Sequence, residues 1–181
     1  MSTGFVVALL GAESTGKTTL ATKLGGALIA GGRRVAVVGE VLREFCDREA
    51  RTPRRDEQAA IAAEQTRRIA AAAAGAEIVV ADTTALMIAV YSELVFGDTS
   101  LYAAAEAEQR RYGLTLLTAL DLPWQADGLQ RDGPHVREPV DRQLRASLAR
   151  AGIAFEPVSG SGSARLEAAL ATIERALAAR S

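Results

Sequence analysis

Two glycines, a lysine and a threonine near the amino terminus stand at the spacing G-x-x-x-x-G-K-T, over residues 11–18. Glycines let the backbone turn so tightly that successive N–H groups can surround an anion. At this spacing Lys17 would reach the outer phosphates of a nucleoside triphosphate, and Thr18 would place its hydroxyl on Mg²⁺. The motif therefore predicts a loop that binds a nucleoside triphosphate and Mg²⁺. The predicted ATP-binding residues are Gly11, Ala12, Glu13, Ser14, Thr15, Gly16, Lys17, Thr18 and Thr19.

The segments on either side of this motif suit a phosphate loop. Residues 5–10 are entirely apolar, which predicts a buried strand, and 17–30 are rich in helix formers. The amino terminus of a helix carries a partial positive charge that favours a bound anion. A glycine-rich turn with an exposed lysine is the alternative, and it explains neither the spacing nor the flanking segments.

Two carboxylates follow apolar runs later in the chain. Asp82 ends the run 78–82, and Glu40 follows 35–38. Because ligands collect at the carboxyl ends of parallel strands, both carboxylates are expected to face the phosphates and the acceptor. We expect Glu40 to be the general base, with Asp82 as a second catalytic candidate and as a Mg²⁺ ligand. Capping of the helix that begins near Thr84 is the alternative role for Asp82.

A polar stretch broken by proline and glycine, at about 121–137, is predicted to be a lid loop. Small-molecule phosphotransferases close over their substrates to exclude water, and arginines on the closing segment can neutralise charge in the transition state. Arg131 and Arg137 are therefore the candidate catalytic cations of this segment. Their alternative role is that of solvated surface arginines.

The same stretch holds the only tryptophan of the chain, Trp124. Its indole could stack on a flat ring of the acceptor, or it could anchor the loop on the core. If the acceptor ring is cationic, Trp124 attracts it by a cation–π interaction and Asp121 and Asp127 attract it by charge.

The sequence as a whole alternates short aliphatic runs with longer segments rich in alanine, glutamate and arginine, which predicts a three-layer α/β fold with a mainly parallel five-stranded sheet. At 181 residues, one P-loop domain over 1–181 is expected. The expected strands are 5–10, 34–38, 77–81, 113–119 and 153–157. The expected helices are 17–30, 40–49, 55–74, 84–96, 100–111, 134–151 and 163–179.

Composition excludes several classes of function. The net charge of −1 argues against a nucleic-acid partner, and the single cysteine and single histidine argue against a structural zinc site. No apolar run approaches the length of a membrane span, so we expect no membrane partner and a cytoplasmic location. Arg48, Arg51, Arg54 and Arg55 are expected on a solvated face, and Tyr91 and Phe96 are expected in the core.

Four motifs together resemble those of bacterial ribosylnicotinamide kinases, the kinase domain of the multifunctional bacterial NAD regulator. They are G-A-E-S-T-G-K-T from Gly11, E-V-L-R-E from Glu40, A-D-T-T from Ala81 and D-L-P-W-Q-A-D-G-L from Asp121. The resemblance implies ATP-dependent phosphorylation of the 5′-hydroxyl of nicotinamide riboside, a nucleoside with a pyridinium ring.

The resemblance also implies roles for particular residues. Trp124 would stack on the pyridinium ring, and the pocket would include Glu40, Arg43, Asp82 and Asp127. Two other functions remain open from the residues alone. One is a kinase of a different nucleoside or small alcohol, and the other is a nucleotide-switched regulatory ATPase that has a protein partner.

Overall fold

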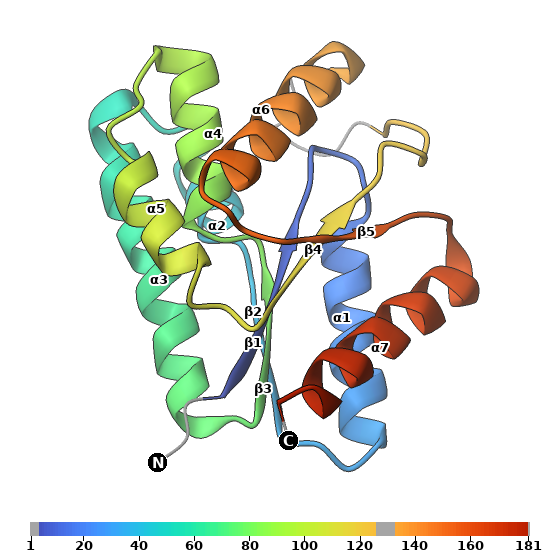
Figure 1. Cartoon of the computed structure of the whole chain (residues 1–181). Coiled ribbons are helices and arrows are strands. Elements are labelled where there is room, and N and C mark those ends of the chain that lie inside the picture. The colour runs from blue at the N-terminus through green and yellow to red at the C-terminus, as the bar shows by residue number, and fades with distance from the viewer. Residues whose placement is uncertain (1–3, 126–132, 181) are drawn as a thin grey trace.

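The computed structural model describes residues 4–125 and 133–180. In these two ranges, parallel strands alternate with helices (Figure 1). The strands are β1 (Phe5–Leu10), β2 (Val35–Val38), β3 (Ile78–Asp82), β4 (Leu114–Thr118) and β5 (Glu156–Val158). The α-helices are α1 (Lys17–Ala30), α2 (Val41–Glu49), α3 (Gln58–Gly75), α4 (Ala85–Phe96), α5 (Tyr102–Gln109), α6 (Arg137–Arg150) and α7 (Gly162–Ala178). Two short 3₁₀ helices are η1 (Arg55–Glu57) and η2 (Pro134–Val136).

The five strands form one sheet in the order β2-β3-β1-β4-β5, and every neighbouring pair is parallel. This confirms the predicted α/β fold. The central position of β1 places the segment that follows it at the middle of the sheet edge. The register brings Leu9 of β1 beside Asp82 of β3, so the end of β3 lies next to that segment. The carboxyl ends of all five strands lie on one edge, where ligands bind in open α/β sheets.

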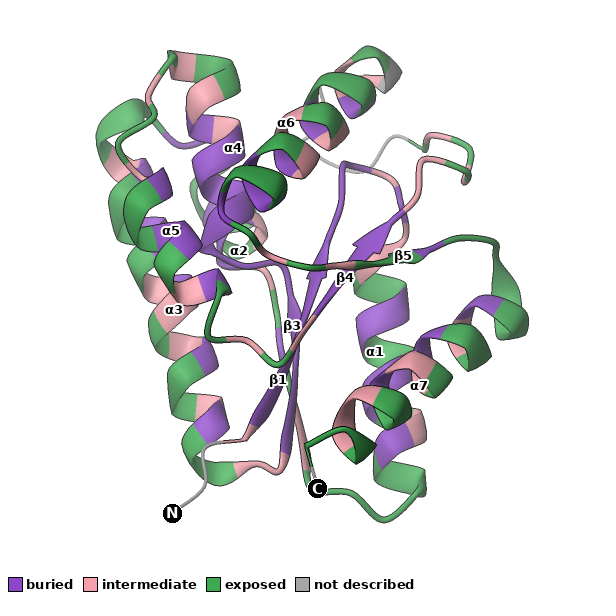
Figure 2. Cartoon of the chain, in the orientation of Figure 1, coloured by how far each residue is buried: buried purple, intermediate pink, exposed green. Residues whose placement is uncertain are grey.

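Helices cover both faces of the sheet, with α1 and α7 on one face and α3, α4 and α5 on the other (Figure 1). Successive side chains of a strand point to opposite faces of the sheet and therefore pack in two different hydrophobic cores. Leu9 packs with α1 and α7, whereas Leu10 packs with α2, α4 and α6. Figure 2 shows the buried strands enclosed between helices with exposed outer faces. Burial on both faces explains why the central strand β1 is continuously apolar instead of alternating.

The predicted element bounds agree closely with the structure except at the last strand. Residues 153–157 were the expected strand, but β5 occupies Glu156–Val158. Ile153 and Phe155 pack against the core that contains α4 and α6. Their apolar character reflects packing of the connection after α6, and not strand pairing. None of the helices in the described part of the chain is long and apolar enough to cross a membrane.

Two adjacent glycines in α1 test the packing of this helix on β2. A methyl group at Gly25 would lie 2.4 Å from Cγ2 of Val37, whereas one at Gly26 would meet nothing within 4 Å. Gly26→Ala should raise the free energy of unfolding by about 1 kcal/mol, because alanine is the better helix former. Gly25→Ala should be less stable than Gly26→Ala by about 1–3 kcal/mol because it overpacks the contact with Val37. Urea denaturation measures both, and equal stability of the two variants would contradict this packing.

Candidate active site

The predicted phosphate loop joins β1 to α1 and depends on glycine at two positions. Gly11 has φ 147° and Gly16 has φ 73°, and Gly16 is the N-cap of α1. A Cβ atom at Gly11 would lie 1.9 Å from Oγ1 of Thr118. No other residue fits there. Because α1 begins at Lys17, the unpaired N–H groups of its first turn lie next to the loop. The loop thus has the shape and polarity of an anion site.

A chain of buried hydroxyls supports the phosphate loop from β4. Thr118 Oγ1 lies 3.1 Å from the Leu10 carbonyl oxygen and 2.7 Å from Thr15 Oγ1, and the Thr15 hydroxyl donates to the Ala12 carbonyl oxygen at 2.8 Å. Lys17 Nζ donates to the same carbonyl at 2.9 Å. Sequence reasoning missed Thr118. The only available signal was a polar residue at the end of an aliphatic strand, which by itself does not indicate a contact with residues 103 positions away.

The loop forms the middle of a cavity of about 1060 Å³. Seven of the nine predicted ATP-binding residues line it, from Glu13 to Thr19. On the β2 and β3 side the wall comes from α2, the segment 52–54 and the last turns of α4. On the β4 and β5 side it comes from the loop after β4 and the start of α7. The cavity therefore has walls on both sides of the phosphate loop.

Glu40 and Arg43 lie on the wall that faces β2 and β3. Glu40 is the N-cap residue of α2, and its side chain is 13% exposed. Arg43 Nε lies 3.8 Å from Glu40 Oε2, and both residues line the cavity. The structure thus brings together Lys17, Thr18, Glu40 and Arg43, as the sequence predicted for a shared site.

Tyr91 and Phe96 also line the cavity, so the expectation that they lie wholly in the core is wrong. Both are partly buried residues of the last turns of α4. Tyr91 packs against the core on one side and borders the cavity on the other. Helical spacing correctly indicated an apolar face, but it does not distinguish packing against protein from packing against a cavity.

Asp82 ends β3 and is 3% exposed. Its Oδ1 atom has no hydrogen-bond partner among the described residues. The helix-capping alternative is wrong, because Thr84 is the N-cap of α4 and its Oγ1 accepts from Leu86 N at 3.3 Å. Thr83, between them, has φ 77°, a strained conformation of the kind that clusters at functional sites. Asp82 is not among the described residues that line the cavity.

Gln65 of α3 links the two turns that carry the candidate carboxylates. Its Oε1 accepts from Val41 N at 2.8 Å, and its Nε2 donates to the carbonyl oxygens of Gly39 at 3.1 Å and Thr83 at 3.5 Å. The amide is fully buried. Gln65 therefore holds the backbone on both sides of Glu40 and contacts the residue after Asp82. Sequence reasoning missed it, because a glutamine inside an alanine-rich helix has no distinctive spacing.

The loop after β4 is described as far as Gln125. Asp121 is exposed, and its Oδ2 accepts from Gly160 N at 2.5 Å, which ties this loop to the connection between β5 and α7. Trp124 is partly buried, and its indole nitrogen is buried without a partner in the described structure. Neither Asp121 nor Trp124 is among the described residues that line the cavity, so no position on its wall supports their predicted contacts with an acceptor. The predicted lid residues Asp127 and Arg131 lie outside the described residues.

Arg137 is the first residue of α6 and is only 8% exposed. Its alternative role as a solvated surface arginine is therefore wrong. Nε and Nη2 have no hydrogen-bond partner within 4–125 and 133–180. Arg137 does not line the cavity, so its predicted catalytic role is not supported by a contact there.

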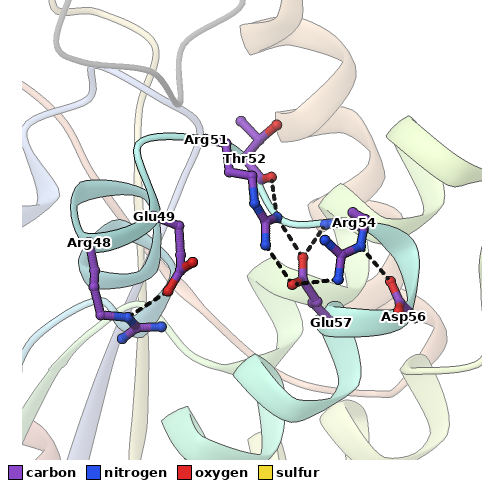
Figure 3. Close-up of polar contacts among 7 residues, drawn as sticks. All are labelled: Arg48, Glu49, Arg51, Thr52, Arg54, Asp56 and Glu57. Carbon is purple, nitrogen blue, oxygen red and sulfur yellow. Dashed lines mark hydrogen bonds and ion pairs between the residues drawn. The ribbon is translucent and has the colours of Figure 1, made fainter.

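The arginine-rich connection between α2 and α3 is held together by one glutamate. Arg51 donates two hydrogen bonds to Glu57, each at 2.7 Å, and the backbone N–H of Arg54 donates to the same carboxylate at 2.7 Å (Figure 3). Arg51 also lies over the Phe45 ring, at 5.1 Å from its centroid. Glu57 thereby fixes the segment 52–54, which lines the cavity. Arg51 and Arg54 are therefore paired within this connection, whereas Arg55 pairs with Asp98.

The donor atoms around the loop fit a magnesium nucleotide better than a metal held by protein alone. The described residues contain no group of three or more His, Cys, Asp and Glu that could hold a metal. Mg²⁺ commonly takes one or two protein ligands and completes its shell with phosphates and water. Thr18 lines the cavity, and Asp82 retains an unpartnered oxygen at the adjacent strand end.

Comparison with known proteins agrees with this geometry. A family model described as an AAA domain matches residues 6–165. The chain belongs to this family. By this match the chain is a nucleotide-binding P-loop domain of the AAA family. No curated protein matches the sequence.

Two solved structures of NadR are similar in fold. The first, in complex with NAD and AMP-PNP, has a TM-score of 0.76 at 21% identity, over 95% of this chain and 49% of that one. The second, in complex with NR, has a TM-score of 0.77 at 20% identity, over 95% of this chain and 50% of that one. The chain spans about half the length of these NadR chains.

Two buried glutamines of α3 make a matched test of the Gln65 contacts. Gln65→Met should lower the free energy of unfolding by about 2–4 kcal/mol, because it leaves buried backbone groups unpaired on both sides of Glu40. Gln58 is also buried, but its Oε1 has no partner in the described chain. Gln58→Met should therefore be neutral or stabilising. Urea denaturation of both variants measures the difference. Equal losses of stability would contradict the role given to the Gln65 hydrogen bonds.

Glu57 and the two arginines that bond to it, Arg51 and Arg54, form the Glu57 cluster. This cluster predicts a pH dependence of stability. Hydrogen bonds from Arg51, and then from the Arg54 backbone, lower the pKa of Glu57 from 4.5 to about 2. A lowered folded-state pKa stabilises the fold above the unfolded-state value, and this stabilisation is lost as the pH falls from about 4.5 toward 2. The stability difference between wild type and Glu57→Gln should therefore shrink across this range.

Chemical denaturation at a series of pH values measures this difference. Glu167→Gln is the control, because Glu167 is exposed on α7 and makes no ion pair with any residue in the described ranges. Its difference from wild type should not follow the Glu57 profile. A Glu57→Gln difference that stays constant from pH 6 to pH 3 would contradict the prediction.

Proposed function

We propose that this protein is an ATP-dependent kinase that phosphorylates nicotinamide riboside to nicotinamide mononucleotide. The observation that carries the proposal is the shared cavity of about 1060 Å³, in which the phosphate loop and the Glu40 carboxylate lie on neighbouring walls. A phosphate loop alone supports only nucleotide binding. The Glu40 carboxylate, on the β2 and β3 side of the same cavity, adds a proton acceptor for a second substrate.

The acceptor wall has the chemistry of a nucleoside site. Tyr91, Phe96 and Pro53 supply flat or apolar surface, and Glu40 supplies negative charge. A pyridinium ring is both flat and cationic, so aromatic faces and a nearby carboxylate favour it. NadR, which shares the fold at about 20% identity, has been solved in complex with NR and with AMP-PNP. Stacking by Trp124, with Asp127 and Asp121 nearby, stays a prediction that requires the loop to reach over the cavity.

The proposed reaction transfers the terminal phosphate directly to the riboside. The 5′-hydroxyl oxygen forms a bond to the γ-phosphorus, and the bond from that phosphorus to the bridging oxygen of ADP breaks. Glu40 accepts the hydroxyl proton, and Asp82 is the second candidate for this step. Lys17 and the loop N–H groups stabilise the negative charge on the phosphates, with Arg131 and Arg137 as further candidate cations.

Magnesium has a specific place in this proposal. Mg²⁺, when bound, neutralises the outer phosphates, and the Thr18 hydroxyl and the Asp82 carboxylate are the side chains that would hold it. The unpartnered Oδ1 of Asp82 supports this assignment. Phosphate oxygens and water would supply the remaining ligands.

The test is ADP formation from Mg-ATP with and without nicotinamide riboside. Riboside should stimulate turnover strongly in the wild-type protein. Glu40→Gln should lower kcat by about 10²–10⁴-fold with a small change in KM, because it removes the proton acceptor. Lys17→Ala should abolish transfer. Glu44→Gln is the matched control, since Glu44 is an exposed residue of the same helix that pairs with Arg68.

A panel of other nucleosides and small alcohols completes the experiment. Stimulation by one of these and not by nicotinamide riboside would overturn the assigned acceptor and favour a kinase of another substrate. Slow hydrolysis that no acceptor changes would favour a regulatory ATPase. A Glu40→Gln variant with wild-type kcat would overturn the assigned base.

A further inference from the structure

Arg165 is a buried arginine on the β4 and β5 side of the cavity. It lies in the first turn of α7, is 5% exposed, and lines the cavity. Nothing in the sequence distinguishes it from the other lysines and arginines of the chain, which number 21 in all. Its position in the fold sets it apart, because α7 follows β5 and packs against α1, the helix that begins at the phosphate loop.

The Arg165 guanidinium is in contact with the phosphate loop itself. Nη2 donates to the Thr15 carbonyl oxygen at 2.7 Å. Nη1 lies so close to Gly16 that a Cβ atom there would be 3.4 Å from it. These two contacts fix the plane of the guanidinium against the loop residues that directly precede Lys17. The side chain is therefore positioned before any ligand binds, which reduces the entropy lost on binding.

The positive charge of Arg165 has no compensating ion pair within 4–125 and 133–180. Asp121 is the carboxylate that attracts it at longer range, but Asp121 accepts its hydrogen bond from Gly160 N. Nε is buried without a hydrogen-bond partner in the described structure. A buried charge without a counter-charge is unfavourable, and most native proteins pair such groups.

Burial lowers the pKa of Arg165, and the nearby Asp121 acts in the opposite direction. Arginine nevertheless keeps its proton in proteins, so the guanidinium stays positively charged. Retaining a charged group at this cost is understandable if the partner is supplied by a ligand. The cavity that Arg165 lines is the one that holds the phosphate loop.

We infer that Arg165 binds the α- or β-phosphate of the nucleotide and is the second cation of the donor site beside Lys17. The assignment to the inner phosphates follows from its place in the sheet. Arg165 approaches the loop from the β5 side, whereas the acceptor residues Glu40 and Arg43 approach from the β2 side. The transferred phosphate must lie toward the acceptor, so the phosphates near Arg165 are those that remain on ADP. A planar guanidinium can bind two phosphate oxygens at once.

Isothermal titration with adenosine, ADP and ATP in the presence of Mg²⁺ tests this inference without any acceptor. Arg165→Met should weaken the binding of ADP and ATP by the same factor, about 10- to 100-fold, because both nucleotides carry the inner phosphates. The affinity for adenosine should not change. Arg165→Lys should recover part of the loss, since it keeps the charge but lacks the planar fork.

The matched control is Arg175→Met. Arg175 lies on the same helix, is exposed, and bonds to Thr172 away from the cavity. Its substitution should leave all three affinities unchanged. The thermal unfolding midpoint of each variant without ligand checks that the phosphate loop still folds.

Three results would overturn the inference. An unchanged ADP affinity in Arg165→Met would exclude a phosphate contact. An equal loss for adenosine would show that Arg165 acts on the fold of the site or on the base. A loss confined to ATP would assign the contact to the γ-phosphate instead. The inference rests on the proposed function only in requiring nucleotide binding. The binding experiment can therefore still be interpreted if the protein does not phosphorylate nicotinamide riboside.

Discussion

The close contact between Gly11 and Thr118 is the constraint on which the site depends. Only a residue without a side chain can pass the Thr118 hydroxyl at this distance, and the same hydroxyl contacts Leu10 and Thr15. The loop between β1 and α1 is thereby fixed to β4, the neighbouring strand of a parallel sheet. A rigid loop keeps its N–H groups directed at an anion without further ordering, which favours both binding and transition-state stabilisation.

Charge is distributed on the two sides of this loop according to the order of the strands. The β2 side carries Glu40, held by Gln65 and paired with Arg43. The β5 side carries Arg165, whose charge has no partner in the described structure. A carboxylate suits the approach of a hydroxyl acceptor, and a buried guanidinium suits the phosphates of a donor. The strand order therefore places the Glu40 carboxylate and the Arg165 guanidinium on opposite sides of β1.

Membership of the AAA domain family over residues 6–165 and the likeness to NadR over 95% of the chain establish the fold. At about 20% identity the likeness does not fix the acceptor. In the proposed kinase the acceptor is selected by the wall formed by α2, the segment 52–54 and α4. The hydrogen bonds of Glu57 and the aromatic residues Tyr91 and Phe96 set the shape of this wall.

The sequence by itself determined the elements, the parallel sheet and the phosphate loop. These features are local, because glycine spacing, apolar runs and helix formers act over a few residues. It also predicted Glu40 beside Lys17, since strand ends in a parallel sheet share one edge.

Only the tertiary structure decided which side chains support that site. Thr118, Gln65 and Arg165 contact residues 18 to 150 positions away in the chain, and nothing in their local sequence indicates those contacts. The structure also places Tyr91 and Phe96, which were expected in the core, on the cavity wall. Trp124 is not among the described residues of that wall. The physical reason is that local sequence sets the direction of a side chain relative to its own helix or strand, whereas packing decides what lies in that direction.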